Sequence, residues 1–212
     1  MFKPSPASTF ALRHRRFRWR GAVGALVLAP VAVMTVLSTP PLAADSWWQI
    51  PIRAMAWTCF LSGAALRFWA TLYIGGRKDD ELVTSGPYSL CRNPLYVGSL
   101  LLGVAAGLFL ESVALSLAMV LMLAIYQQTA VRAEENVLRA RHGHEFDEYS
   151  RRVPRFWPSL DGFRTSDHVT VHMRSLWNEC ARASRWVWLP ALGEILTRLR
   201  TQPWWPSLFH RL

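Results

Sequence analysis

Residues 86–98 read Gly-Pro-Tyr-Ser-Leu-Cys-Arg-Asn-Pro-Leu-Tyr-Val-Gly, and a long apolar stretch begins within them. The dipeptide Gly86-Pro87 is typical of a turn. Pro94 suits the first turn of a helix, because its missing N–H would be unpaired there in any case. Arg92 therefore stands just outside the start of a helix. This stretch predicts a polar rim at the mouth of a membrane helix.

The apolar stretch predicts a hairpin with arms at 95–110 and 113–126. Both arms are short for full membrane crossings, so we expect a tilted hairpin in a thinned or protein-lined part of the bilayer. The adjacent carboxylates Glu134 and Glu135 follow the second arm. They return to the same rim and supply acceptors for a cationic ligand.

The composition favours a membrane protein. Of the 212 residues, 51% are hydrophobic and eleven are Trp, yet the formal net charge is +10. The charge must therefore be segregated from the apolar stretches. The length is that of a single domain. The three cysteines have no short spacing that would seat a metal or a redox pair, so we expect reduced cysteines and no metal site.

The first predicted membrane span is residues 21–44, which carry no charged residue and follow a basic leader at 1–20. At about 1.5 Å per residue, such a helix crosses a hydrocarbon core about 30 Å thick. A cleaved signal peptide is the alternative, indicated by Arg15-Arg16 and by the small residues Ala43-Ala44. In both cases the chain lies outside at residue 45.

The second predicted span runs from Ile50 to Ile74 and contains Arg53 and Arg67. Arg53 lies near one end and can extend to the headgroups. Arg67 lies about two turns from the other end, and it either does the same or faces the protein interior. Tryptophans flank the outer side of this span, as in the aromatic belts of membrane proteins. They are Trp47, Trp48 and Trp57.

The distribution of basic residues predicts the orientation. Lys and Arg lie in the leader, in the loop at 75–93 and after Tyr126, apart from the two arginines of the second span. Because basic loops stay on the cytoplasmic side, we expect both termini and the 75–93 loop in the cytoplasm, with four membrane passes in the region 21–126. The predicted class is an all-α integral membrane protein of the bacterial inner membrane, with cytoplasmic helices and an amphipathic tail.

A polar helix at 127–141 is predicted to follow the hairpin, and Glu135 has two interpretations on it. Glu135 and Arg139 are spaced i, i+4 and would pair on a solvated face. Alternatively, Glu135 and Glu134 face Arg92 at the membrane rim. The position directly after the hairpin favours the second interpretation.

The motif and the carboxylate pair together resemble the isoprenylcysteine carboxyl methyltransferase and phospholipid methyltransferase group. Its members carry Arg-His-Pro, a Tyr two residues on and a Gly, then a long apolar stretch and Glu-Glu. Asn93 stands here in place of the usual His. The stretch from Phe146 through Tyr149 to an Arg-Val-Pro run also resembles the group's closing segment, which folds back toward the cofactor. The similarity covers about residues 61–158.

The resemblance implies a membrane-embedded methyltransferase that uses S-adenosylmethionine, with a cofactor-binding segment at 127–158. Methyl transfer from this cofactor mainly requires orientation of donor and acceptor. Carboxylates suit the sulfonium, ammonium and ribose groups of the cofactor, and Arg92 suits its carboxylate. The residues that the resemblance implies in cofactor binding are Tyr88, Arg92, Asn93, Pro94, Tyr96, Glu134, Glu135 and Tyr149.

The expected acceptor is a hydrophobic or lipid-linked molecule, with a carboxylate as the first choice. A carboxylate is ionised near neutral pH and needs only a cation to position it, for which the catalytic candidates are Arg92 and Arg152, or Arg155 in place of Arg152. Phospholipid amine N-methylation is the alternative. An amine must first lose a proton, and His142 and His144 are the nearest candidate bases.

Two further classes are less favoured by the sequence. A membrane reductase that uses NADPH has a related Arg-His-Pro-x-Tyr region, but the adjacent carboxylates would repel that cofactor's phosphates. A non-enzymatic membrane scaffold is the other class. The high positive charge is accounted for by topology and by anionic membrane lipids, so we expect membrane lipids and no nucleic acid as partners.

The tail at 159–212 lies beyond the resemblance. Apolar residues recur at helical spacing on both sides of Pro190, with several tryptophans nearby. Such basic amphipathic helices either lie on the inner leaflet or pack against the catalytic core, and the sequence leaves both alternatives open. The sequence determines neither the acceptor's identity nor the oligomeric state.

Overall fold

The computed structural model describes residues 24, 26, 28–41, 46–76 and 81–209. The described residues form helices and loops, with no strand among them, which confirms the predicted all-α class. Residues 28–36 are helical. The labelled helices are α2 (Gln49–Ile74), α3 (Pro87–Leu90), α4 (Pro94–Phe109), α5 (Val113–His142), α6 (His144–Arg152), α7 (Met173–Trp186) and α8 (Leu189–Arg200).

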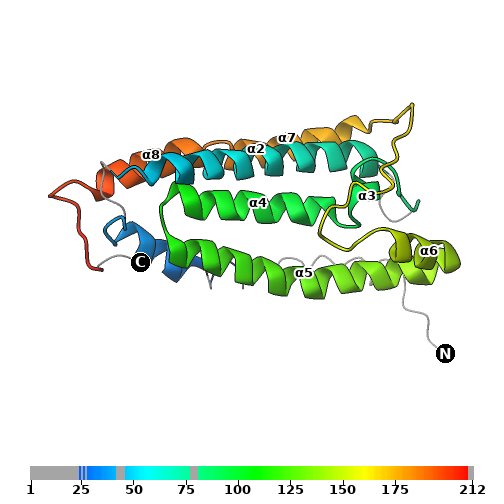
Figure 1. Cartoon of the computed structure of the whole chain (residues 1–212), viewed down its shortest axis with the longest axis horizontal. Helices are drawn as coiled ribbons and strands as arrows, with labels where there is room; N and C mark the ends of the chain where they lie inside the picture. Colours follow the sequence, from blue (N-terminus) through cyan, green and yellow to red (C-terminus); the bar gives the residue numbers. More distant parts are fainter. Residues whose placement is uncertain (1–23, 25, 27, 42–45, 77–80, 210–212) are drawn as a thin grey trace.

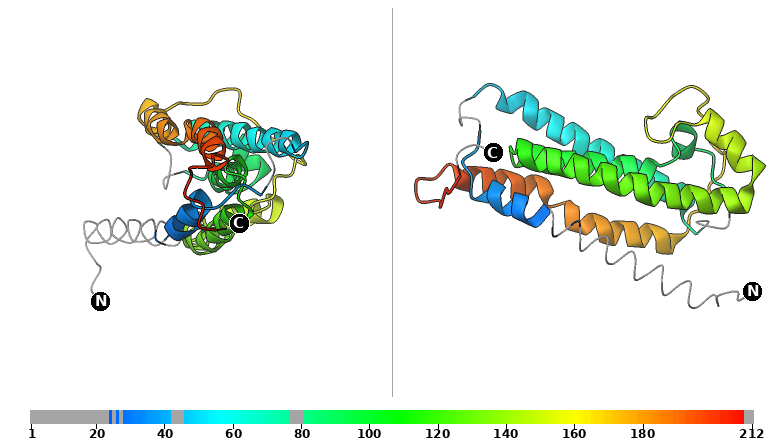
Figure 2. Two further views of the ribbon diagram at one scale, coloured as in Figure 1. Left: turned by 90° about the vertical axis from the view of Figure 1, so that its left-hand side faces the viewer. Right: turned by 90° about the horizontal axis from the view of Figure 1, so that it is seen from below.

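The helices form an elongated bundle with α4 at its centre (Figure 1). α4 packs against α2, α5 and α8, and α7 packs against α2. α7 and α8 follow one another along α2 and run in the opposite direction (Figures 1 and 2). The loop at 86–93 and α6 lie at one end, and the turn between α4 and α5 lies at the other. We call these the motif end and the far end.

Two glycines allow α2 and α4 to pack closely. A Cβ at Gly98 would lie 2.9 Å from the carbonyl oxygen of Gly63 and 2.6 Å from Cγ of Arg67. Small residues at a helix contact let the backbones approach, which is a common solution where lipid supplies no hydrophobic driving force. This contact brings the aliphatic stem of Arg67 directly against α4.

The second hairpin arm and the polar helix, predicted as separate elements, are one helix, α5. No Gly or Pro interrupts residues 113–142, so nothing in the backbone ends the helix at Tyr126. Ser112 caps its start, where the side-chain oxygen accepts a hydrogen bond from the Leu115 N–H at 3.1 Å. Gly143, with φ of 52°, ends it. The apolar half and the carboxylate pair therefore share one rigid element.

Within the described residues, α5 is the one helix that is long and apolar enough to cross a membrane by composition, and α4 is a shorter apolar helix. The predicted second span and first hairpin arm match α2 and α4 to within a residue. The first predicted span, 21–44, lies partly outside the described residues. Its described helical part ends at residue 36, before Pro40 and Pro41. The four membrane passes remain a prediction.

The tail packs against the bundle, which is one of the two alternatives that the sequence left open. Two of its charged residues face inward: Glu179 is 1% exposed and Arg200 is 2% exposed. Arg200 donates hydrogen bonds to the carbonyl oxygens of Ser38, at 2.8 Å, and Leu110, at 2.6 Å. Large apolar side chains face outward. They include Met173, Trp177, Trp188, Leu192 and Ile195.

This packing places residues 201–209 at the far end, where the Leu208 N–H donates to the carbonyl oxygen of Leu37 at 2.8 Å. The sequence predicted both termini on the side of the motif loop. In the structure the described C-terminal part lies at the far end, because α7 and α8 return along α2 (Figure 1); the side of the membrane on which it lies stays a prediction. The predicted leader at 1–20 lies outside the described residues.

Candidate functional site

The motif loop is held in place by a glycine with a positive φ angle and by a returning segment of chain. Gly86 has φ of 60°, a conformation that favours glycine, and a Cβ there would overlap the Tyr73 ring. Its N–H donates to the carbonyl oxygen of Arg164 at 2.7 Å. Six residues later, the Arg92 N–H donates to the carbonyl oxygen of Pro154 at 2.9 Å. The segment 153–165 thus covers residues 86–93.

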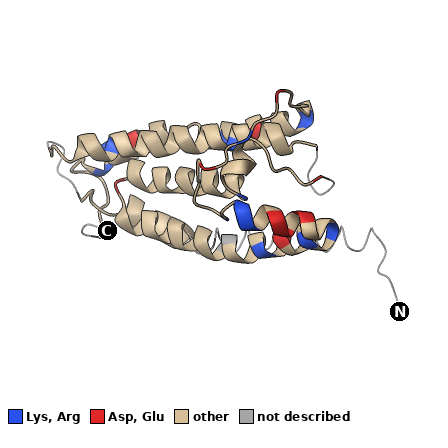
Figure 3. Ribbon diagram, turned by 45° about the vertical axis from the view of Figure 1, so that its right-hand side comes forward, with Lys and Arg blue, Asp and Glu red and all other residues tan. Residues whose placement is uncertain are grey.

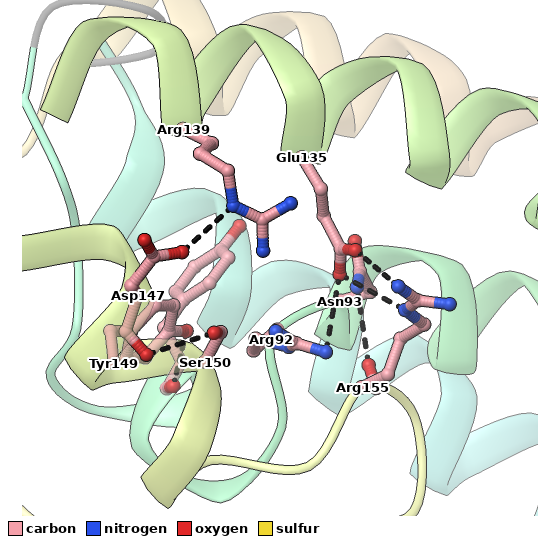
Figure 4. A network of polar contacts seen from close by, with 9 residues as sticks. Arg92, Asn93, Glu135, Arg139, Asp147, Tyr149, Ser150 and Arg155 are labelled. Atoms are coloured by element: carbon pink, nitrogen blue, oxygen red, sulfur yellow. Dashed lines mark hydrogen bonds and ion pairs between the residues drawn. The ribbon is translucent and has the colours of Figure 1, made fainter. Parts of the chain in front are cut away.

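Glu135 joins three elements at the centre of the site (Figure 4). Arg155 binds it with two parallel contacts, Nε to Oε1 at 3.1 Å and Nη2 to Oε2 at 2.5 Å. Arg92 Nη2 lies 3.5 Å from the same Oε1. The Glu135 side chain is 8% exposed and that of Arg92 is 12% exposed, so both charges are largely removed from water and must be paired. Glu135 therefore connects α5 to the motif loop and to segment 153–165.

Neutral hydrogen bonds complete this framework. The Tyr149 hydroxyl donates to the carbonyl oxygen of Tyr88 at 2.7 Å. Asn93 Nδ2 donates to the carbonyl oxygen of Arg155 at 3.2 Å. Asn93, which replaces the group's usual His, thus fixes the backbone that carries Arg155. Pro94 occupies the first turn of α4, as the sequence predicted.

A cavity of about 560 Å³ opens beside this framework. Small-molecule sites are typically ~300–1,000 Å³ and mostly apolar, with a few converging polar groups. The cavity walls come from α2, the motif loop, α4, α5, α6 and α7. Its polar and aromatic lining residues are Arg67, Glu81, Tyr88, Arg92, Asn93, Tyr96, Ser99, Glu134, Glu135, Phe146, Tyr149, Arg182 and Arg185.

Two buried polar atoms of this lining have no hydrogen-bond partner among the described residues: the Tyr88 hydroxyl and Arg92 Nε. Buried polar groups normally have hydrogen-bond partners. Two buried polar groups without such partners beside a cavity therefore indicate a place for a ligand. Burial raises the pKa of Tyr88 well above its ordinary value, and burial also raises the pKa of Tyr149. Both phenols therefore stay neutral donors at physiological pH.

The cavity brings together every residue that the resemblance implied in cofactor binding. Arg152, predicted as catalytic, is instead exposed at the end of α6 and is outside the lining. Arg155, its alternative, reaches Glu135 because the backbone becomes extended at Val153. His142 and His144 are also outside the lining.

The solvated pair of Glu135 and Arg139 does not form. Arg139 Nε lies 2.8 Å from Oδ1 of Asp147, and the guanidinium stands over the Phe146 ring at 5.3 Å. Arg139 therefore fastens α5 to α6. Glu135 points the other way, into the site (Figure 4).

Sequence reasoning missed the part of the cavity wall built by α2, α4 and α7. Arg67 Nε lies 2.7 Å from Oε1 of Glu179, and Arg67 Nη1 donates to the Ser99 hydroxyl at 2.6 Å. An arginine inside an apolar span was a signal that some carboxylate must pair with it. Nothing local identified Glu179 as the partner, because it lies 112 residues away in the sequence.

Comparison with known proteins assigns the family. A sequence model of the phospholipid methyltransferase family matches residues 51–145. The nickel-cobalt-cadmium resistance protein NccN of Alcaligenes xylosoxydans xylosoxydans is 32% identical, over 96% of this chain and 92% of its own length. The chain belongs to the phospholipid methyltransferase family. Another relative, the cobalt-zinc-cadmium resistance protein CzcN of Cupriavidus metallidurans, is 35% identical over 88% of this chain and 82% of its own.

The match to the phospholipid methyltransferase family ends before most of α6 and before segment 153–165 and α7. Part of the cavity wall therefore lies outside the region that the family model describes. The names of the two relatives refer to metals. Within the described part of this chain, no three His, Cys, Asp or Glu side chains are grouped so that they could hold a metal ion. No solved structure matches the chain.

Proposed function

We propose that this protein is a membrane-embedded, S-adenosylmethionine-dependent methyltransferase that methylates a carboxylate on a hydrophobic or lipid-linked acceptor, as in isoprenylcysteine-type O-methylation. The observation that carries the proposal is the cavity at the motif end. Glu134, Glu135, Arg92 and the unpaired Tyr88 hydroxyl line one space there, next to the apolar walls of α4 and α5.

The lining fits the chemical groups of this cofactor. Glu134 and Glu135 suit its ammonium and ribose hydroxyls, and the free Nε of Arg92 suits its carboxylate. Tyr88, Tyr96 and the Phe146 ring supply aromatic surface of the kind that binds a nucleobase. When bound, S-adenosylmethionine supplies a methyl group that its sulfonium has already made electrophilic.

The chain's own contribution is positioning and exclusion of water. An acceptor carboxylate oxygen forms the new bond to carbon as the carbon–sulfur bond breaks, and the sulfur's positive charge and the carboxylate's negative charge cancel. No proton moves, so no general base is needed. Guanidinium groups beside the cavity are the positioning groups that such an acceptor requires.

Phospholipid amine N-methylation is the second candidate, because the family description names phospholipids. An amine must be neutral when it attacks, so its ammonium form must first give a proton to an acceptor, and the attack then leaves the positive charge on the methylated nitrogen. Glu134, a carboxylate of the cavity lining outside the Glu135–Arg155 pair, is the candidate proton acceptor. The two candidates differ in the product, which is a base-labile ester in one case and a stable methylamine in the other.

The cofactor assignment is tested by Glu134→Gln and Glu135→Gln. Each change removes a charge-assisted hydrogen bond and should lower S-adenosylmethionine affinity about ten- to a hundredfold, or about 1.5–3 kcal/mol. Titration calorimetry on purified protein in detergent measures this. Glu148→Gln, an exposed carboxylate of α6, is the matched control and should bind the cofactor like the wild type.

A second variant separates cofactor binding by Glu135 from a purely structural role. Arg155→Gln breaks the same ion pair but leaves the Glu135 carboxylate in place. If Glu135 binds the cofactor, Arg155→Gln retains much more affinity than Glu135→Gln. Equal losses in the two variants would show that the pair only holds segment 153–165, and unchanged affinity in both glutamate variants would refute the assignment. The acceptor itself is found by incubating the protein with labelled S-adenosylmethionine and a total lipid extract.

A further inference from the structure

We propose that Arg182 and Arg185 of α7 bind the anionic group of the methyl acceptor, a carboxylate or a phosphate carried on an apolar chain. This inference rests on the proposed function and adds the residues that select the acceptor. Both arginines line the same cavity as the carboxylate pair of α5. They come from α7, which lies outside the region matched by the family model.

Among the residues that the structure describes, the α7 side of the cavity carries an excess of positive charge. Glu179 is shared by two guanidiniums, with Arg67 Nε at 2.7 Å from Oε1 and Arg182 Nη1 at 2.5 Å from Oε2. Arg185 has no hydrogen bond or ion pair in the described part of the chain. Glu179 thus pairs with two arginines, and Arg185 adds a further positive charge to the cavity lining. An anion bound between Arg182 and Arg185 would reduce the excess positive charge.

The position of these arginines in the bundle strengthens the argument. α7 lies along α2 (Figure 1), and Arg67 on α2 is 8% exposed. Cationic side chains among apolar membrane helices either pair with counter-ions or mark the path of a charged ligand. Arg67 already has its partner in Glu179. Arg182 and Arg185 are the cationic groups on this wall with donors left for a ligand.

The rest of the cavity shows how the acceptor would lie. The wall opposite α7 is formed by apolar residues of α5, among them Leu123, Val137 and Leu138. An amphiphile can place its chain along this wall and its anionic group on α7, with the reacting atom toward the carboxylates at the motif end. An uncharged or purely cationic head would leave the arginines unpaired. The acceptor is therefore an anionic or zwitterionic amphiphile.

Equilibrium binding tests this without depending on methyl transfer. The labelled probe is N-acetyl-S-farnesylcysteine, and its methyl ester is the same chain without the charge. Wild type should bind the acid at least about tenfold more tightly than the ester, because the acid makes charge-assisted hydrogen bonds. Arg185→Gln should reduce this preference to about threefold or less. Arg185→Lys should restore most of it, since it keeps the charge.

The controls separate a binding role from a structural one. Arg174→Gln also removes an exposed α7 arginine, but from outside the cavity lining, and it should keep the full preference. In methyl-transfer assays, Arg185→Gln should raise KM for the acceptor while kcat and the S-adenosylmethionine affinity stay near wild type. A parallel loss of cofactor affinity and acid preference would overturn the assignment to the acceptor.

Competition by dioleoyl phosphatidate identifies the source of the anion. If phosphatidate displaces the labelled acid at a lower concentration than the unlabelled acid does, the site is assigned to a phosphate headgroup. If phosphatidate displaces the labelled acid less effectively, the site is assigned to a carboxylate. Equal binding of acid and ester by the wild type would refute the inference. Absence of S-adenosylmethionine binding by a wild-type protein that still prefers the acid would instead refute the proposed function and leave the anion site standing.

Discussion

Arg92 shows how much of the site depends on the geometry of one side chain. Its Nη2 approaches Glu135 at 3.5 Å, while its Nε is buried without a partner among the described residues. A planar guanidinium can hold Glu135 on one edge and present a second edge to a ligand carboxylate. The ammonium of Lys is a point charge on a flexible stem and cannot do both.

We therefore expect Arg92→Lys to be nearly as damaging as Arg92→Ala. Both variants should raise the S-adenosylmethionine concentration needed for half-maximal methyl transfer by about tenfold or more, because the second hydrogen-bonding edge is lost. The measurement is the transfer rate against cofactor concentration, at matched membrane insertion. Near-wild-type activity in the Lys variant would show that Arg92 supplies only positive charge at the membrane surface.

The sequence predicted which side chains meet at the site better than it predicted their pairings. Local spacing offered Arg139 to Glu135, but the fold gives it Arg155, which lies beyond α6. In the same way Arg152 and Arg155 were equivalent candidates in the sequence. The extended backbone at Val153, with φ of −108° and ψ of 125°, turns the two side chains in different directions. Such choices depend on tertiary contacts that helix periodicity does not encode.

At the scale of elements, α7 shows why the tail was ambiguous in the sequence. Its apolar residues were expected to face either lipid or the protein core. In the structure Trp177 is 74% exposed while Glu179 is 1% exposed, so a large apolar side chain faces outward and a charged one is buried. An apolar outer face costs nothing in a lipid solvent, whereas a charged residue must find a partner within the bundle. By contrast, α2 and α4 were predicted to within a residue, because continuous apolar runs ending at Gly75 and starting at Pro94 mark their limits.

Two ion pairs join α2 to the tail, and they should differ strongly in importance. Arg67 pairs with Glu179 where both side chains are at most 10% exposed. Arg53 pairs with Glu194 where they are 39% and 35% exposed. Glu179→Gln should cost about 3–5 kcal/mol, because it leaves the buried Arg67 charge without its counter-ion. Glu194→Gln should cost less than about 1 kcal/mol.

Denaturant unfolding in detergent micelles measures this difference. The double variant Arg67→Met with Glu179→Leu should be more stable than Glu179→Gln alone, because the buried Arg67 charge is removed together with its counter-ion and the half-exposed Arg182 stays solvated. Equal effects of Glu179→Gln and Glu194→Gln would contradict the packing of α7 on α2. Arg182 keeps its length and charge in all these variants, so the acceptor site is not removed directly.

In the whole molecule, charged residues are distributed unequally between the two ends of the bundle. Charged residues gather at α6 and the C-terminal part of α5, and α4 carries none (Figure 3). The far end nevertheless holds Arg53, Arg198 and Arg200 beside Glu111 and Glu194. Burial raises the pKa of Glu111, while Arg53 and Arg200 oppose that shift. The far-end charges are thus partly neutralised within the protein, so counting basic residues alone overstates how strongly the tail is retained in the cytoplasm.

The orientation of the tail is therefore the decisive prediction for the whole molecule. α7 and α8 together extend about 40 Å at 1.5 Å per residue, enough to cross a hydrocarbon core about 30 Å thick. The chain should enter the membrane after the motif end and leave it at the far end. Residues 201–209 would then lie on the side opposite the motif loop.

Single cysteines test this in a background with Cys59 and Cys180 replaced by Ala. Cys91 can stay, because it is 1% exposed and burial raises the pKa of its thiol to about 11, so it reacts poorly with thiol reagents at neutral pH. Leu160→Cys, at a position 81% exposed beside the motif loop, should react with an impermeant reagent only after the inner face is opened. Gln202→Cys, which is also exposed, should react in intact cells. Protection of both positions in intact cells would place the tail on the cytoplasmic side. That result would require α7 and α8 to leave the bundle, and with them Arg182 and Arg185 would leave the cavity.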